Sequence, residues 1–147
     1  MPVSNFSIGR DIQVVILHVL APGGTGRLDL SIVTGFDSKE TRKKIQIPGL
    51  DGITRTGFVP ESYPLTIMTE RGNNQMDLFL SAIDAAYRSG LNVPTGSVYT
   101  YVQEPNGSTT TTFYDQVAFD RSDAGSWKQD AAVNQTLTGV AATKQVV

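Results

Sequence analysis

The clearest pattern of apolar and polar positions along the chain is helical and runs from Gln75 to Arg88. Apolar residues recur there every three or four positions, the spacing that places them on one face of a helix. Asn73 or Asn74 can accept a hydrogen bond from the first free amide groups, and Gly90 supplies a left-handed stop. The pattern therefore predicts a helix over Gln75–Arg88. It should pack on a sheet through Met76, Phe79, Leu80, Ile83 and Tyr87.

The opposite side of this helix carries small and apolar residues where a surface helix is normally polar. Leu78, Ala82 and Ala85 all fall there. We expect these residues to be approached by another element or by another subunit. A single exposed leucine is nevertheless ordinary on any protein surface.

Most of the remaining pattern is typical of strands. The continuous apolar run 12–20 predicts a strand covered on both faces, and the alternating segment 28–36 predicts its hairpin partner across a glycine-rich turn. The tail 143–147 is predicted to be frayed or to depend on a partner. Further strands are predicted at 65–69, 97–104, 109–119 and 131–142, with a loop at 120–126.

Segment 37–61 breaks this pattern. It opens with clustered charges and is then punctuated by proline and glycine, yet large apolar residues recur throughout it. A long connection of this kind is uncommon in a compact domain, and a flexible loop has no need of large apolar side chains. We predict an arm or extended hairpin covered by a neighbouring molecule; the alternative is a strand-containing loop folded onto its own core. The candidate interface residues are Lys43, Ile45, Ile47, Leu50, Ile53 and Phe58.

Composition limits the classes of protein to consider. The 147 residues are enough for one domain, and a net charge of −2 argues against a basic surface that wraps nucleic acid. With no cysteine, the chain has no disulfides, thiolate zinc sites or thiol catalysis. No stretch approaches the roughly 20 apolar residues of a membrane span.

Candidate chemistry is sparse. His18 is the sole histidine and lies in an apolar run, so we expect a buried, hydrogen-bonded side chain rather than a catalytic or metal-binding one. The glycine cluster 23–26 lacks the following helix and lysine of a phosphate loop. Trp127 is expected to be either a lid over the core or an interface anchor. Solvated turns are the expected setting of Asp115, Asp120, Asp123 and Asp130. We predict no catalytic, cofactor-binding or metal site, and no enzyme.

The length, the order of elements and the stretch 123–137 resemble the tail tube proteins of contractile-tailed bacteriophages. This resemblance implies a mainly β fold with one helix, a β-sandwich or half-barrel. It also implies hexameric rings that close through a shared β-barrel and stack into a hollow tube, with 37–61 as the loop that reaches the adjacent ring. The implied partners are further copies of the chain, sheath and baseplate proteins, and DNA that passes through the lumen without specific binding. The implied location is the virion tail, assembled in the host cytoplasm.

Two alternatives stay open. The tube proteins of type VI secretion use the same fold, so a secretion-type tube fits the resemblance equally. The other is a small β-rich carbohydrate- or ligand-binding module, in which Tyr99, Tyr101, Tyr114 and Trp127 stack on sugar rings. The tube readings predict rings or filaments, and the module predicts a stable monomer with a ligand cleft.

Overall fold

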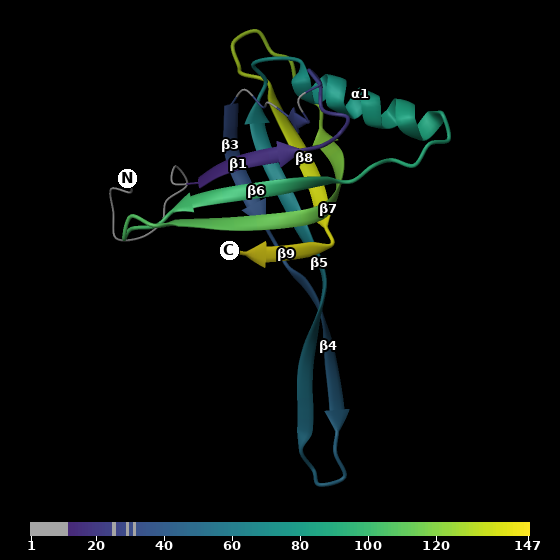
Figure 1. Ribbon diagram of the computed structural model, residues 1–147, viewed down its shortest axis with the longest axis vertical. Coiled ribbons are helices and arrows are strands. Elements are labelled where there is room, and N and C mark those ends of the chain that lie inside the picture. The colour runs from purple at the N-terminus through teal and green to yellow at the C-terminus, as the bar shows by residue number, and fades with distance from the viewer. Residues whose placement is uncertain (1–11, 25, 29, 31) are drawn as a thin grey trace.

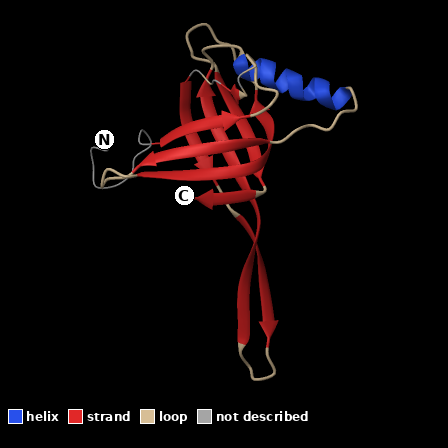
Figure 2. Ribbon diagram, viewed as in Figure 1, coloured by secondary structure: helices blue, strands red, loops and turns tan. Residues whose placement is uncertain are grey.

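Strands make up most of the fold, and one helix lies across one end (Figures 1 and 2). The computed structural model describes residues 12–24, 26–28, 30 and 32–147. The elements in this part of the chain are β1 (Ile12–Leu17), β2 (Arg27–Leu28), β3 (Ile32–Ser38), β4 (Thr41–Pro48), β5 (Thr54–Glu70), α1 (Gln75–Arg88), β6 (Gly96–Gln103), β7 (Thr109–Asp123), β8 (Asn134–Ala141) and β9 (Thr143–Val146).

The strands form one curled antiparallel sheet in the order β2-β1-β6-β7-β8-β5-β3, with β4 paired to β5 and β9 paired to β7. The curl divides it into two layers. Sheet A contains β2, β1, β6, the first part of β7 and β9. Sheet B contains the end of β7, β8, the second part of β5 and β3. The strands of the two layers cross in Figure 2, which gives a half-barrel, one of the two forms that the resemblance implies.

The two sheets are joined where β7 bends at Gln116. This residue has a φ of 51°, and its N–H donates to the Asp115 carboxylate at 2.8 Å. Up to Val117, β7 pairs with β6 and β9; from Ala118 onward, it pairs with β8. Ala142, between β8 and β9, donates its N–H to the Asp115 carbonyl at 3.2 Å. Strand β7 and the β8–β9 connection therefore pass between sheet A and sheet B side by side.

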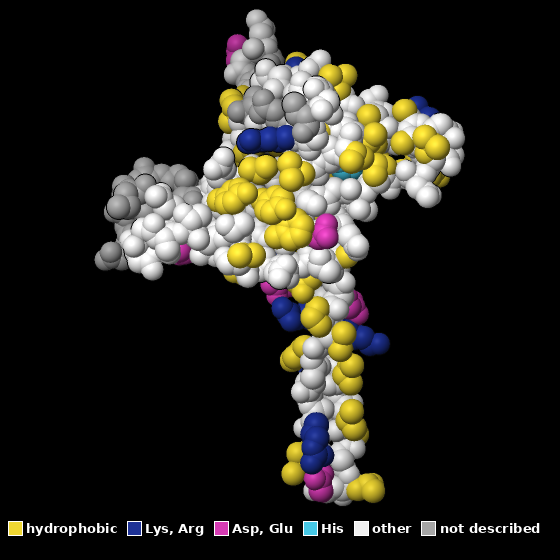
Figure 3. All heavy atoms as spheres, in the orientation of Figure 1, with side chains coloured by type: hydrophobic (Ala, Val, Ile, Leu, Met, Phe, Trp, Pro, Cys, Tyr) yellow, Lys and Arg dark blue, Asp and Glu magenta, His cyan; other side chains and the backbone are white. Residues whose placement is uncertain are grey.

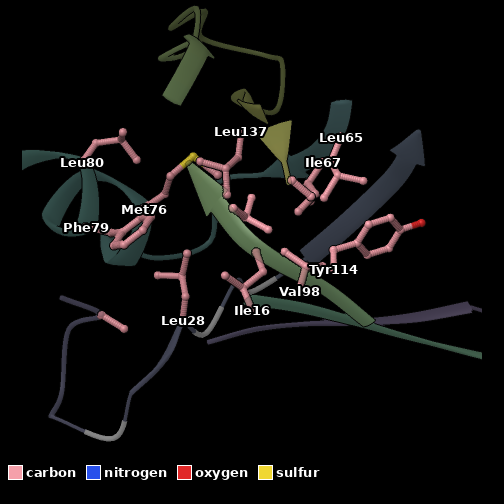
Figure 4. Packing of buried hydrophobic residues seen from close by; sticks show 13 residues of the cluster. Ile16, Leu28, Leu65, Ile67, Met76, Phe79, Leu80, Val98, Tyr114 and Leu137 are labelled. Atoms are coloured by element: carbon pink, nitrogen blue, oxygen red, sulfur yellow. The ribbon is translucent and has the colours of Figure 1, made fainter. Parts of the chain in front are cut away.

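The core fills the space between the two sheets and the first turns of α1. Met76, Phe79 and Leu80 point from the helix toward residues of both sheets (Figure 4). Residues of the strands in this cluster include Ile16, Val98 and Tyr114 from sheet A and Leu65, Ile67 and Leu137 from sheet B. Burial of these side chains is the main favourable contribution to folding.

Helix α1 has the predicted bounds. The Asn73 carboxamide accepts the Gln75 N–H at 3.1 Å, and Gly90, at a φ of 77°, ends the helix while Leu91 donates to the Ala86 carbonyl. The prediction that Tyr87 is buried is wrong, because its side chain is 76% exposed. The last turns of α1 extend beyond the edge of the sheets, so none of the strands described covers them (Figure 1).

The predicted hairpin at the start of the domain is only partly correct. β1 ends at Leu17 and its hairpin partner β2 is two residues long. The rest of 28–36 does not continue that strand: β3 lies in sheet B beside β5. The apolar alternation spans both segments because both contribute to one core: Leu28 is buried, and Phe36 packs against the same cluster.

Three other boundaries differ from the predictions. The strand expected at 65–69 is the end of the longer β5, and part of the loop expected at 120–126 belongs to β7. The tail is not frayed, because β9 pairs with β7 within the chain, with Thr112 opposite Val146 and Asp115 opposite Thr143. These differences arise from strand pairing between distant segments, which local composition does not reveal.

Candidate assembly surfaces

The most prominent surface is a two-stranded arm, residues 41–62, formed by β4 and the first part of β5 (Figure 1). Its tip is closed by hydrogen bonds from Gly49 N–H to the Ile53 carbonyl at 2.9 Å and from Gly52 N–H to the Gly49 carbonyl at 3.1 Å. All eight residues of β4 are exposed. The extended hairpin predicted from the sequence is confirmed, and the alternative of a loop folded onto its own core is wrong.

The candidate interface residues of segment 37–61 all lie on this arm. Lys43, Ile45 and Ile47 are on β4, and Phe58 is on β5. Leu50 and Ile53 flank the tip. All six side chains are exposed, Ile47 and Phe58 each to 62%. Their cover by a neighbouring molecule stays a prediction.

The root of the arm is held by the Glu40 carboxylate. It accepts hydrogen bonds from Arg42 at 2.7 Å and from Lys144 of β9 at 3.0 Å. These hydrogen bonds lower the pKa of Glu40 below its usual value, and the bond from Arg42 has the largest effect. Lys144 also lies 5.6 Å from the centre of the Tyr114 ring, and the Tyr114 hydroxyl lies 2.9 Å from the Ser38 hydroxyl. The C-terminal strand thus contacts the point where the arm leaves the domain.

The second group of predicted interface residues lies on the outer side of α1. Leu78 is 47% exposed, Ala85 is exposed and Ala82 is half-buried. Helix and arm lie at opposite ends of the molecule (Figure 1). The structure therefore does not bring the two groups together within one chain.

The outward face of sheet B is acidic and rich in hydroxyl groups. The register places Asp37, Thr66, Thr138 and Asp120 in one row across its strands. The next row carries Asp123 and Thr136 beside Met68. No lysine or arginine occupies the outward positions of these paired strands in the described part of the chain. This surface is not evident from the sequence, because alternation shows which residues of a strand share a face but not which strands are neighbours.

The outward face of sheet A is different: hydrophobic side chains gather on it over β1, β6 and β7 (Figure 3). The Tyr99 ring lies 4.6 Å from Phe113, at an interplanar angle of 28°, and 6.4 Å from Tyr101, at 10°. These rings stack on one another along the sheet. Tyr114, in contrast, points into the core and is only 3% exposed.

Sheet B has two edges at which no further strand of the described chain pairs. One edge is β3, which pairs only with β5, and the other is the 118–123 part of β7, which pairs only with β8. Unpaired edges expose rows of backbone N–H and C=O groups that can pair with another chain. Both edges belong to the sheet with the acidic face.

A network around Asp77 ties the start of α1 to the strands. Its carboxylate accepts hydrogen bonds from Arg121 of β7, from Arg71 Nε at 3.1 Å and from Gln135 Nε2 of β8 at 3.1 Å. Burial raises the pKa of Asp77, but these hydrogen bonds outweigh burial and hold the pKa below its usual value. Trp127 lies beside this network, with the Arg71 guanidinium 5.2 Å from its ring centre. Since Trp127 is 70% exposed, its interpretation as a lid over the core is wrong.

His18 has the structural role predicted for it. Its Nδ1 accepts the Leu20 N–H at 3.0 Å, which leaves Nε2–H to donate to the Pro94 carbonyl at 3.0 Å. Burial lowers the pKa of His18, and the bond to Pro94 opposes that effect only in part. The ring is therefore neutral near pH 7 and packs edge-on against Phe79.

No reactive site emerges from the described residues. Among them, no group of three or more His, Asp or Glu side chains could hold a metal ion. Asp115, Asp120 and Asp123 each accept a nearby backbone N–H. A cavity of about 460 Å³ opens between β1 and β3, and its lining contains no charged side chain. None of the helices described is long and apolar enough to cross a membrane.

The chain matches no protein-family model and no curated protein sequence. It does match solved structures. A chain of the anti-feeding prophage cap, described as the tube-terminating cap, has a TM-score of 0.66 at 10% identity, covering 100% of this chain and 94% of the other. A chain from the sheath-tube complex of an extracellular contractile injection system, PVC, gives 0.59 at 10% identity and covers 92% and 88%.

The tail tube of SPP1 gives a TM-score of 0.58 at 11% identity, over 96% of this chain and 78% of the other. The chain has the tail-tube fold. At such low identity, these matches show that the fold is shared and nothing more. How this protein assembles depends on its own surface residues.

Proposed function

We propose that this protein is a structural, non-enzymatic subunit of a hollow tube of the phage-tail or contractile-injection type. Copies of the chain close into hexameric rings, and the rings stack into a conduit through which DNA passes during ejection. The observation that carries this proposal is sheet B, which combines two edges unpaired within the described chain with an outward face that has acidic and hydroxyl side chains and, among the described residues, no lysine or arginine. The tail-tube fold supports it.

Ring closure follows from the direction of the edge strands. Neighbouring strands of sheet B are antiparallel throughout, so the end of β7 and β3 run in opposite directions. In a ring with cyclic symmetry, every copy has the same orientation relative to the axis. The β3 edge of one copy then meets the β7 edge of the next in antiparallel orientation. Such a barrel has no remaining edges, which removes the usual route to edge-to-edge aggregation.

The acidic face gives the inside of that barrel a suitable surface for DNA. Cationic side chains bind nucleic acid by displacing counterions from phosphates, and their absence favours sliding over sticking. Asp37 and Asp120 end the row on sheet B, with the hydroxyls of Thr66 and Thr138 between them. In the proposed ring, this row lines the lumen.

Stacking is assigned to the arm. It protrudes from one end of the domain and contributes almost nothing to its own core. A contact between an arm on one copy and a different surface on the next is head-to-tail, and such contacts propagate into open stacks. Lys43, Ile45, Ile47, Leu50, Ile53 and Phe58 are the proposed contact residues. Leu78, Ala82 and Ala85 of α1 remain proposed as a second contact between subunits.

The proposed place of the protein is the tail of a virion, with assembly in the host cytoplasm. Sheath proteins would surround the tube, and baseplate proteins would meet its tip. The match to a chain of a sheath-tube complex supports a contractile system. A secretion-type tube would use the same rings and stacks without DNA.

A tube-end subunit is a second candidate, favoured by the match to the tube-terminating cap over the whole chain. A terminator closes one end of a stack, so its rings do not propagate. The carbohydrate-binding alternative is disfavoured because Tyr114 is buried and the faces of Tyr99, Tyr101 and Phe113 stack on one another. Sugar binding would need those ring faces free.

The test is negative-stain electron microscopy of the purified chain across a concentration series, with sedimentation velocity to give the mass of each species. Stacked hexameric rings support the tube subunit, and single rings that never stack support the terminator. A monomer at every concentration would count against both and would favour a binding module.

A further inference from the structure

Gly57 lies in the middle of the arm, and its own chain does not require a glycine there. It pairs with Ile45 in regular register; the register shift in this pair of strands lies between Thr41 and Arg42, near the root. Its φ is outside the left-handed region that favours glycine, and a Cβ would meet no atom within 4 Å. Neither a turn, a bulge nor crowding within the chain accounts for it.

A glycine inside a strand has a cost. It is less stable than alanine there by about 0.5–1 kcal/mol because of its greater freedom in the unfolded chain. Where no bulge or bend is present, a strand glycine often marks a point that another backbone or ligand approaches closely. For an arm that extends into solvent, the approaching group must come from another molecule.

The arm has two unlike faces, because residues directly opposite each other in an antiparallel pair lie on the same side. The face that carries Gly57 is aliphatic, with one cation toward each end. Its members are Lys43, Ile45, Ile47, Arg55, Gly57 and Val59. The opposite face is mostly polar and consists of Arg42, Lys44, Gln46, Pro48, Thr54, Thr56, Phe58 and Pro60.

The distribution of charge along the chain indicates what the arm binds. The arm carries four Lys or Arg and two Asp or Glu, whereas the rest of the chain carries eight and twelve. The arm is therefore basic and the remainder is acidic. Lys43 and Lys44 belong to no ion pair formed by the described residues. A basic, aliphatic arm fits the acidic body of a second copy of this chain.

We infer that the aliphatic face of the arm packs against the body of a second copy, and that Gly57 is the point of closest approach. The bare backbone at Gly57 leaves a notch between Ile45, Ile47 and Val59 that receives a side chain or backbone of the partner. Phe58 then lies outside the closely packed part of this contact. The inference rests on the proposed stacking of this protein and adds the face and the residue that make the contact.

The experiment compares Gly57→Leu with Thr56→Leu in the full-length chain. Both place a leucine at an exposed position on the same arm, but on opposite faces. Circular dichroism should show both variants folded like the parent, and neither should unfold at a lower temperature, since a Cβ at Gly57 meets no atom within 4 Å and Thr56 is exposed. Sedimentation velocity and electron microscopy then measure the protein concentration at which stacks form.

Gly57→Leu should need at least a tenfold higher concentration to stack, about 1.4 kcal/mol for the addition of one ring, while Thr56→Leu should stack like the parent. The assignment of this face would be overturned if Gly57→Leu stacked at the same concentration as the parent. It would also be overturned if both variants lost stacking to the same extent. If the parent chain itself forms no stacks, the proposed function fails, and the inference fails with it. The two failures are therefore distinguishable.

Discussion

Arg121 of β7 and Asp77 of α1 form an ion pair that fixes the first turn of the helix to sheet B. The same carboxylate also accepts from Arg71 and Gln135, so one side chain joins the helix to three segments of the chain. Its position in the first helical turn is favourable as well, because the helix dipole stabilises negative charge there.

Replacing Asp77 with Asn should destabilise the protein by about 1–2 kcal/mol, since charged hydrogen bonds are stronger than neutral ones but the site is partly exposed. Urea unfolding measures the change. Asp84→Asn on the exposed side of the same helix is the matched control and should change stability by no more than about 0.5 kcal/mol. Equal effects of the two substitutions would contradict the role of the network.

Acid should remove the contribution of Asp77. Because its native pKa is lowered, its stabilising effect is fully present above the ordinary carboxyl pKa of about 3.9 and is lost as pH falls through the native value. The stability difference between the parent and Asp77→Asn should therefore narrow below about pH 4. A difference that stays constant down to pH 2 would show that the substitution acts through packing instead.

The sole histidine offers a direct measurement of burial. His18 should titrate below the ordinary value of about 6.5 in an NMR pH series, because burial lowers its native pKa. The unfolded chain binds the proton more tightly, so this residue should lower stability as pH falls below about 6.5. A midpoint at or above 6.5 would be inconsistent with the buried, neutral ring.

Replacing two strand glycines, Gly96 and Gly57, with alanine should have different effects on stability. At Gly96, a Cβ would lie 2.6 Å from the Leu17 carbonyl oxygen and 2.8 Å from the His18 and Phe119 rings, so Gly96→Ala should cost about 1–3 kcal/mol. At Gly57 the space is open, and Gly57→Ala should leave the monomer unchanged or slightly more stable. Thermal unfolding of the two variants makes the comparison, and a tolerated Gly96→Ala would argue against the close approach of β6 to β1.

Charge reversal on sheet B tests the proposed lumen. Tubes of Asp37→Lys/Asp120→Lys should retain short double-stranded DNA in a nuclease-resistant and salt-sensitive form, because cations facing phosphates bind them. A control pair on other surfaces, Asp84→Lys/Asp130→Lys, changes the net charge equally and should bind DNA only where nuclease can reach it. Protection by the control alone would place the lumen on another face.

The sequence by itself determined the features that depend on local spacing. Helix α1 runs from Gln75 to Arg88 as predicted, because its periodicity, the hydrogen bond to Asn73 and the Gly90 stop all depend on residues close together in the sequence. The apolar residues of segment 37–61 likewise indicated an extended hairpin, since no flexible loop requires them. The absence of cysteine and the apolar setting of His18 likewise argued against thiol chemistry and a histidine-based site.

Tertiary structure alone decided which surfaces these elements form. The row from Asp37 to Asp120 joins strands more than 80 positions apart, and its members become neighbours only through the pairing of β3, β5, β8 and β7. Tyr87 has the right helical phase for burial and is nevertheless exposed, because the sheets end before the helix does. Periodicity specifies which way a side chain points from its own element, whereas non-local pairing and packing determine what lies opposite it.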